Sequence, residues 1–212
     1  GLSWHDPQDP AGRDPLRDAD MAMYQAKSIG AGGVQIFDDA MREWVEQRVE
    51  LELALRRAVD RDELDAHVQP VIDLRTGAVT GGELLCRWRN DAGEEVSPAD
   101  FIGLAEDSIL VVDIGRRMLE RAGAVLAEWA TDERLAGLTL SINLSGRHVE
   151  RPSVVSDVAD ALDRWNVPPA RLTLELTETV LLRDLAEAAV TLSALRDLGV
   201  TISVDDFGMG HA

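Results

Sequence analysis

Hydrophobic and polar positions along residues 63–212 follow two periods, one typical of strands and one typical of helices. Apolar residues at every second position predict strands, and apolar residues three or four positions apart predict helices. Strands separated by helices of about 12 residues indicate βαβ units and a mostly parallel sheet, either open or closed into a barrel. The predicted elements are strands at 67–74 and 78–87 joined by a turn at 75–77, a helical region at 98–130 with a break near Ser108, a strand at 138–144, a helix at 154–165, a strand at 171–177, a helix at 185–198 and a strand at 200–205.

The N-terminal part of the chain follows a different pattern. Residues 1–18 are rich in Asp, Pro and Gly, which predicts a loop, and a short helix at 19–29 follows with Asp18 or Asp20 as its cap. Residues 39–60 predict a long charged helix with apolar positions four residues apart. Because so polar a helix is often a connector between domains, we expect a domain boundary within it.

The predicted strands repeat one arrangement of side chains. Successive side chains of a strand point to opposite faces, and three strands have one aliphatic face and one face of small polar residues. The active sites of α/β folds lie at the C-terminal ends of such strands. Any one polar residue there is most simply an exposed strand end, but four strands that agree in position and facing favour a shared site. The residues concerned are Asn143, Glu175 and Asp205 in the three strands, and Glu83 in the hairpin, with Leu85 and Arg87 on its side.

These candidate ligands are carboxylates and one amide, which favour Mg²⁺ or Mn²⁺ over zinc. Asp206 follows Asp205 directly, and both reach one site only if the strand ends there. The glycines at Gly208 and Gly210 allow that break. Two adjacent carboxylates at a strand end suit a pair of ions, the arrangement that hydrolyses phosphodiesters. The alternative for this segment is an ordinary Asp-rich turn.

Composition and charge narrow the classes of protein that fit this pattern. The chain of 212 residues is 45% hydrophobic, which is enough for a packed core. Its 39 acidic against 21 basic residues give a net charge of -18, which disfavours nucleic acid polymers and anionic membranes. No apolar run approaches the roughly 20 residues of a membrane-spanning helix. The single cysteine, Cys86, excludes an internal disulfide and is expected to face the core, and the four histidines show no metal-ligand spacing.

Several of these residues lie within motifs of a known family. The run Glu83-Leu84-Leu85-Cys86-Arg87-Trp88 resembles the signature of EAL domains, the cyclic di-GMP phosphodiesterases, in its ELL form. Three positions depart from the family pattern, with Val68 where an aromatic residue is common, His148 where Gln is usual and Met209 where Thr is usual. The other matching segments are, in chain order, Gln69-Pro70, the run from Pro98 to Glu106, Asn143-Leu144-Ser145, Glu175-Leu176-Thr177-Glu178 and Asp205-Asp206-Phe207-Gly208.

The EAL resemblance implies a fold, a reaction and a role for each motif residue. The implied fold class is α/β, a (β/α)₈ TIM-type barrel with its first strand antiparallel, incomplete at the C-terminus of this chain. The implied reaction is hydrolysis of cyclic di-GMP to linear pGpG with two Mg²⁺ or Mn²⁺ ions. The resemblance assigns metal binding to Glu83, Asn143, Glu175, Asp205 and Asp206, catalysis to Glu83, Asp205 and Asp206, substrate binding to Gln69, Leu85 and Arg87, and the anchoring of a loop to Glu178.

The segment from Ala19 to Gly30 looks like the last helix of a GGDEF (diguanylate cyclase) domain. We therefore expect a remnant of an α/β GGDEF domain at 1–38, a linker helix at 39–62 and about two-thirds of an EAL domain at 63–212. The expected partners are cyclic di-GMP and a second copy of the EAL domain in a homodimer. We expect no nucleic acid polymer and no membrane contact from this segment, and a cytoplasmic location, where the nucleotide is.

Two alternatives to the enzyme remain open at this point. The first is an inactive EAL domain that binds cyclic di-GMP as a sensor and signals through the linker helix. The second is an unrelated metal-dependent barrel enzyme, which would make the ordered series of motifs a coincidence. The family's catalytic Lys falls after Ala212, so the sequence leaves the first alternative open.

Overall fold

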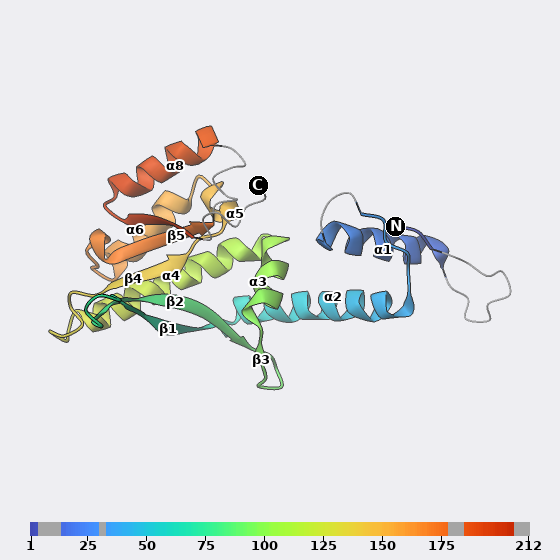
Figure 1. Cartoon of the computed structure of the whole chain (residues 1–212), viewed down its shortest axis with the longest axis horizontal. Coiled ribbons are helices and arrows are strands. Elements are labelled where there is room, and N and C mark those ends of the chain that lie inside the picture. Colours follow the sequence, from blue (N-terminus) through green and yellow to red (C-terminus); the bar gives the residue numbers. More distant parts are fainter. Residues whose placement is uncertain (4–13, 30–32, 178–184, 206–212) are drawn as a thin grey trace. The chain divides into compact units, whose positions relative to one another are not determined.

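The computed structural model describes residues 1–3, 14–29, 33–177 and 185–205 (Figure 1). The chain divides into two compact units, Gly1–Leu55 and Arg56–Ala212.

The first unit contains helix α1 (Pro15–Ile29), which begins earlier than the sequence pattern predicts. The side chain of Asp14 accepts a hydrogen bond from the backbone N–H of Leu16 at 3.0 Å, so Asp14 is the cap. A helix that starts on an Asp-Pro pair is favoured, because proline lacks only an N–H that would be unpaired there. The expected capping by one of two later aspartates is therefore wrong. Asp18 is instead buried and forms an ion pair with Arg42 at 2.8 Å.

Helix α2 (Asp39–Asp60) confirms the predicted long charged helix, and it crosses from the first unit into the second. Its apolar stripe is only partly buried. Met41 packs within the first unit, whereas Val49 and Leu53 are about half exposed, at 51% and 52%. Leu55 is fully buried. The middle of α2 therefore adds little to the core of either unit.

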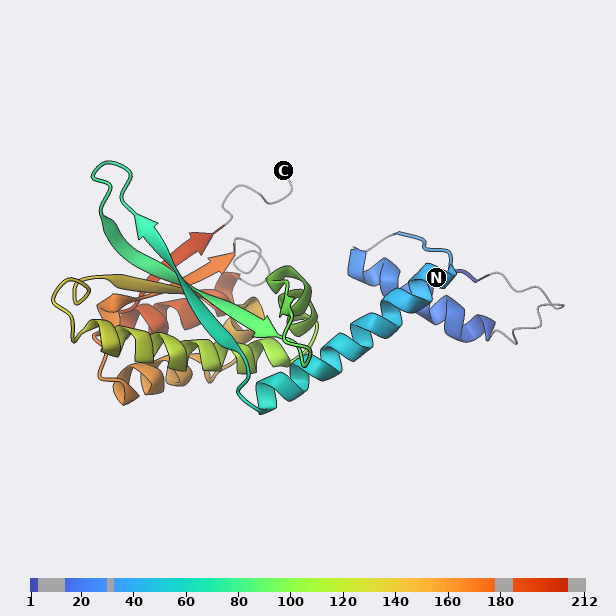
Figure 2. The ribbon, with the colours of Figure 1, turned by 90° about the horizontal axis from the view of Figure 1, so that it is seen from below.

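The second unit is built on a sheet with strand order β1-β2-β4-β5-β6. The β1–β2 pair is antiparallel, as predicted, and the other neighbours along this order are parallel. A short strand, β3, pairs with the end of β2. Within the described residues the sheet is open, with β1 and β6 at its edges, so a closed barrel is not observed there (Figure 2). The strands are β1 (Asp65–Ile72), β2 (Val79–Arg89), β3 (Glu95–Val96), β4 (Thr139–Asn143), β5 (Leu172–Thr177) and β6 (Thr201–Asp205).

Helices α4, α6 and α8 lie side by side along one face of the sheet (Figures 1 and 2). The predicted break near Ser108 is confirmed, since α3 ends and α4 begins on either side of it. Gly199, with φ of 97°, ends α8 in a conformation that favours glycine. No helix in the described ranges is long and apolar enough to cross a membrane. The helical elements are α3 (Pro98–Glu106), α4 (Leu110–Trp129), α5 (Gly146–Val149), α6 (Val154–Arg164), the 3₁₀ turn η1 (Pro169–Arg171) and α8 (Leu185–Asp197).

The predicted aliphatic strand faces form the core beneath these helices. In β4 and β5, Leu140, Ile142 and Leu174 have no exposed surface. The pattern weakens in β6, where Ile202 is half-buried and Val204 is 39% exposed. Because β6 is an edge strand of the described sheet, fewer neighbours cover its aliphatic face. The polar residues of these strands lie on the opposite face of the sheet.

Candidate functional site

The C-terminal parts of neighbouring strands bring three predicted ligands together. Asn143 on β4 and Glu175 on β5 are register partners, and Glu83 on β2 is paired with Ser141, two residues before Asn143. The amide Nδ2 of Asn143 donates a hydrogen bond to Oε1 of Glu83 at 2.8 Å. Since a bond to a carboxylate is stronger than one between neutral groups, it holds both side chains at one edge of the sheet. The side chains that strand facing placed on one face thus lie together at one edge of the sheet, and their role as a site stays a prediction.

The pKa of Glu175 shows that further carboxylates lie near it. Burial raises this pKa above its ordinary value, and the negative charges of Glu83 and Asp205 raise it further. A hydrogen bond with Ser141 acts in the opposite direction. The carboxylates of β2 and β6 are therefore close enough to repel that of Glu175 when they are ionised.

This raised pKa predicts how the stability of the metal-free protein depends on pH. Protonation of Glu175 removes the cost of burying its charge and then its repulsion with Glu83 and Asp205, so the folded state binds that proton at a higher pH than the unfolded chain. We expect stability from this group to rise as pH falls through the raised pKa toward its ordinary value. Urea unfolding in EDTA between pH 7 and pH 4.5, compared with Glu175→Gln, measures this contribution. A wild-type advantage that shrinks as pH falls would contradict the assignment.

The chemistry of these donors fits a hard divalent cation. Glu83, Asn143, Glu175 and Asp205 offer oxygen atoms only, and a cation would relieve the repulsion that raises the pKa of Glu175. Within the ranges that the structure describes, no three His, Cys, Asp or Glu side chains form a group that could hold a metal ion. Asp206, the fifth predicted ligand, and Glu178, the predicted loop anchor, lie outside the described residues.

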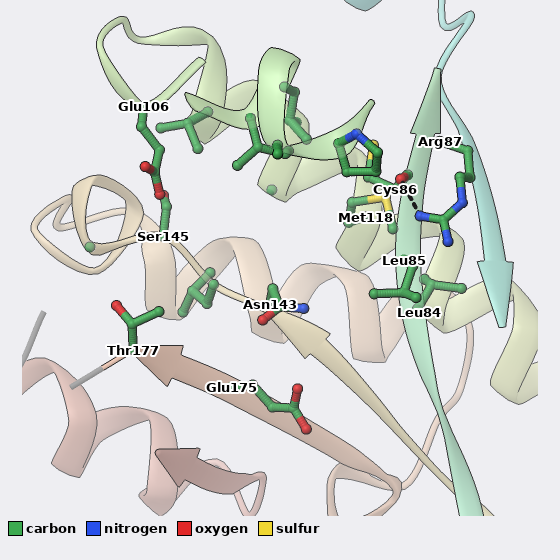
Figure 3. Close-up of a pocket in the computed structure, with 18 residues that line it drawn as sticks. Leu84, Leu85, Cys86, Arg87, Glu106, Met118, Asn143, Ser145, Glu175 and Thr177 are labelled. Atoms are coloured by element: carbon green, nitrogen blue, oxygen red, sulfur yellow. Dashed lines mark hydrogen bonds between the residues drawn. The ribbon is translucent and has the colours of Figure 1, made fainter. Parts of the chain in front are cut away.

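A cavity of about 370 Å³ is lined in part by the predicted ligands Asn143 and Glu175 (Figure 3). One side of it is polar and comes from the strand ends, with Asn143 and Glu175. The other side is apolar and comes from α3 and α4. Strand alternation carries no information about helices that fold back over a sheet, so this wall could not be predicted from the strand pattern. Its apolar residues include Pro98, Ala99, Ile102, Val111, Ile114 and Met118.

Two of the three predicted substrate-binding residues, Leu85 and Arg87, line this cavity. The Arg87 guanidinium donates to the backbone carbonyl of Cys86 at 3.0 Å, as Figure 3 shows, and its Nε lies 3.6 Å from Oε1 of Glu95. The third, Gln69, is exposed on β1 opposite Glu83 and is not among the described residues that line the cavity. Leu85 and Arg87 thus line the same cavity as the predicted ligands Asn143 and Glu175, whereas Gln69 lies on the neighbouring strand β1.

Cys86 also lines the cavity but is not poised as a nucleophile. Burial raises the pKa of its thiol to about 11, so the thiol stays protonated near neutral pH. This fits the expectation of a packing role, although the side chain is only partly buried. His148, which lacks metal-ligand spacing and was expected to be a surface or packing residue, has no exposed surface and packs in the interior.

The chain is similar in sequence and in fold to known proteins. The sequence profile of the family described as "EAL domain" matches residues 52–212. The oxygen sensor protein DosP of Escherichia coli is 36% identical over 197 residues, which are 93% of this chain and 24% of DosP. The chain spans a quarter to a third of the length of the curated relatives it matches.

Solved structures agree with the sequence comparison. The PaMucR phosphodiesterase in its c-di-GMP complex is 34% identical, with a TM-score of 0.72 over 77% of this chain and 66% of that one. The EAL enzyme Bd1971, bound to cAMP and cyclic-di-GMP, is 25% identical, with a TM-score of 0.73 over 95% of this chain and 54% of that one.

Proposed function

The chain belongs to the EAL domain family, and from this membership we propose that it hydrolyses cyclic di-GMP to linear pGpG with two Mg²⁺ or Mn²⁺ ions. The observation that carries the proposal is the hydrogen-bonded pair of Glu83 and Asn143 beside Glu175, at the edge of a cavity that also contains Arg87. PaMucR and Bd1971, which share this fold, were solved with cyclic di-GMP bound. This combination favours a nucleotide phosphodiester as the substrate.

The reaction proposed is the addition of one water to one of the two phosphodiester bonds. The water oxygen forms a bond to phosphorus, the bond from phosphorus to the ribose O3′ breaks, and the two water protons end on the O3′ hydroxyl and in solvent. The product keeps a 5′-phosphate at the cleaved position and the second phosphodiester intact. Divalent cations, when bound, lower the pKa of water and polarise the phosphoryl group.

The cations would be held by Glu83, Asn143, Glu175 and Asp205, with Asp206 as the further proposed ligand. In the described structure the Asn143 amide donates to Glu83, which leaves the amide oxygen of Asn143 available as a ligand. Glu83 and Asp205 already raise the pKa of Glu175, so the site is arranged to gain from positive charge. We assign the catalytic contribution to Glu83, Asp205 and Asp206, through the cations they orient.

Substrate binding is proposed to combine one charged and several apolar contacts. The Arg87 guanidinium suits a phosphate through two parallel N–H donors, and its nearest acid, Glu95, is far enough at 3.6 Å to be replaced. Leu85 and the apolar wall from α3 and α4 suit the flat face of a guanine base. Gln69 on β1 would contact the dinucleotide from the neighbouring strand.

The remaining assignments concern the longer protein. We propose that residues 1–38 are the end of a GGDEF domain, that 39–62 form the linker helix and that 63–212 begin the EAL domain. We also propose that Glu178 anchors the loop after β6, that the EAL domain forms homodimers and that the protein acts in the cytoplasm.

Metal removal tests the proposal most directly. The full-length protein is incubated with cyclic di-GMP and Mn²⁺ or Mg²⁺, and pGpG is measured by chromatography. We expect turnover that EDTA abolishes and added Mn²⁺ restores, because the reaction depends on charge supplied by the cations. Turnover that persists in EDTA would contradict the two-metal proposal.

The same experiment separates the enzyme from the sensor. The sensor alternative requires only the cavity with Leu85 and Arg87, and no cation at the strand ends. Tight binding of cyclic di-GMP without any pGpG, in either metal, would support the sensor and reject the enzyme.

A further inference from the structure

His148 is the buried member of a polar network behind the proposed site. The side chain is in the short helix α5, has no exposed surface, and places Nε2 2.9 Å from Oδ2 of Asp157 in α6. The same carboxylate oxygen accepts hydrogen bonds from Arg116 of α4 at 3.0 Å and from Ser153 at 3.2 Å. The network thus joins α4, α5 and the start of α6.

The chemistry of the partners determines the state of the ring. An ionised carboxylate only accepts, so Nε2 carries the hydrogen in this bond. Burial, the largest cause, lowers the pKa of His148, so the imidazole is neutral near pH 7. Its other nitrogen, Nδ1, is then bare, and it has no hydrogen-bond partner among the described residues. In the described part of the chain, the ring is therefore hydrogen-bonded from one side only.

The Nδ1 side of the His148 ring packs against the backbone of Gly115 in α4. A Cβ added to Gly115 in α4 would lie 2.5 Å from Nδ1 of His148, closer than real Cβ contacts, and 3.1 Å from Cε1, which is tight. The imidazole fits against α4 only because residue 115 has no side chain. Gly115 also lines the cavity, as does Gly146 at the start of α5. The ring therefore lies directly behind the cavity wall.

His148 also belongs to the segment that follows Asn143, a proposed metal ligand, at the end of β4. Asn143 ends β4, and α5 begins three residues later, with Ser145 accepting a hydrogen bond from the backbone N–H of His148 at 3.2 Å. Between them, Leu144 donates its backbone N–H to the carbonyl of Glu175 at 2.8 Å. The segment from Asn143 to His148 is thus fixed by β5 at one end and by Asp157 at the other.

We propose that His148 is a positioning residue, whose imidazole, clamped between Asp157 and the bare backbone of Gly115, holds the β4–α5 segment so that Asn143 meets Glu83. His148 acts through Asn143 and does not touch the substrate. The catalytic part of this inference rests on the proposed phosphodiesterase activity, whereas the clamp itself does not.

Hydrogen exchange tests the clamp without metal or substrate. In the full-length protein, Asp157→Asn and His148→Ala are expected to speed amide exchange of residues 144–149 about tenfold or more, since each removes a charge-assisted bond. Exchange in β5 stays unchanged. Asp160→Asn, an exposed site one turn along α6, is the matched control. Unchanged exchange at 144–149, or an equal rise throughout the domain with a lower Tm, would overturn the proposal.

A pair of substitutions tests the contact with Gly115. Gly115→Ala places a methyl group against the ring and is expected to speed exchange at 144–149, as His148→Ala does. In the double variant the methyl group has room, so we expect the two effects not to add. Additive effects would show that the ring and Gly115 act independently and would reject the clamp.

Turnover tests the positioning of Asn143. His148→Ala is expected to lower kcat roughly 10- to 100-fold with little change in KM, the usual cost of disturbing groups that orient metal ligands. His148→Gln, which can still donate to Asp157, restores most of it. A KM effect alone, or no rescue by Gln, would contradict positioning. If the wild type shows no turnover, the proposed function fails, while the exchange results still decide the clamp.

Discussion

Glu83→Gln is expected to lower cyclic di-GMP hydrolysis on the order of a thousandfold. The substitution keeps the shape of the side chain but removes a negative oxygen from the proposed cation site and the charge from its bond with Asn143. Cation stabilisation of a phosphoryl transition state is worth several kcal/mol, and each 1.4 kcal/mol is about tenfold in rate. Initial rates of pGpG formation at saturating Mn²⁺ measure the effect.

A second carboxylate on the same domain supplies the control. Glu94 also accepts a hydrogen bond from an asparagine side chain, Asn90, at 3.1 Å, but it is exposed in the loop between β2 and β3. Glu94→Gln should therefore leave turnover unchanged. Activity of Glu83→Gln within tenfold of the wild type would reject the assignment of Glu83 to the cation site.

Trp88→Ala is expected to give the largest loss of stability, about 3–5 kcal/mol. Trp88 at the end of β2 is 2% exposed and packs edge-on against Phe101 of α3, with ring centroids 5.8 Å apart. The substitution opens a large cavity beneath α3, and the aromatic contact is lost with it. Urea unfolding followed by circular dichroism measures the change.

Trp165 provides the comparison, because it is 38% exposed and its indole N–H reaches Glu120 at the surface. Trp165→Ala should cost clearly less than Trp88→Ala. Equal losses would show that the contact of Trp88 with Phe101 is not a principal part of the core.

The strand pattern predicted the sheet well because alternation is a local property of each strand. Expected and observed strand ends differ by no more than two residues, and the aliphatic faces of β4 and β5 are buried as predicted. The start of α1 was missed for an equally local reason, since Asp14-Pro15 was interpreted as part of a loop rather than as a helix cap.

The strand residues of the site could be predicted from the sequence, but its helical wall could not. Strand facing selected Glu83, Asn143 and Glu175, whereas the apolar cavity wall from α3 and α4 carries no signal in strand periodicity. His148 was expected to be an ordinary surface or packing residue, because its spacing matches no metal motif. Its partner Asp157 lies nine residues away in another helix, beyond what spacing can indicate.

The sequence by itself determined which side chains of β4 and β5 face the polar side, and so which residues could bind a cation. It also determined the EAL motifs and the long charged helix. Only the tertiary structure decided that Asn143 meets Glu83, 60 residues away, and that a neutral imidazole fits against Gly115. The physical reason is that facing follows from the geometry of one strand, whereas these contacts depend on how separate strands and helices pack together.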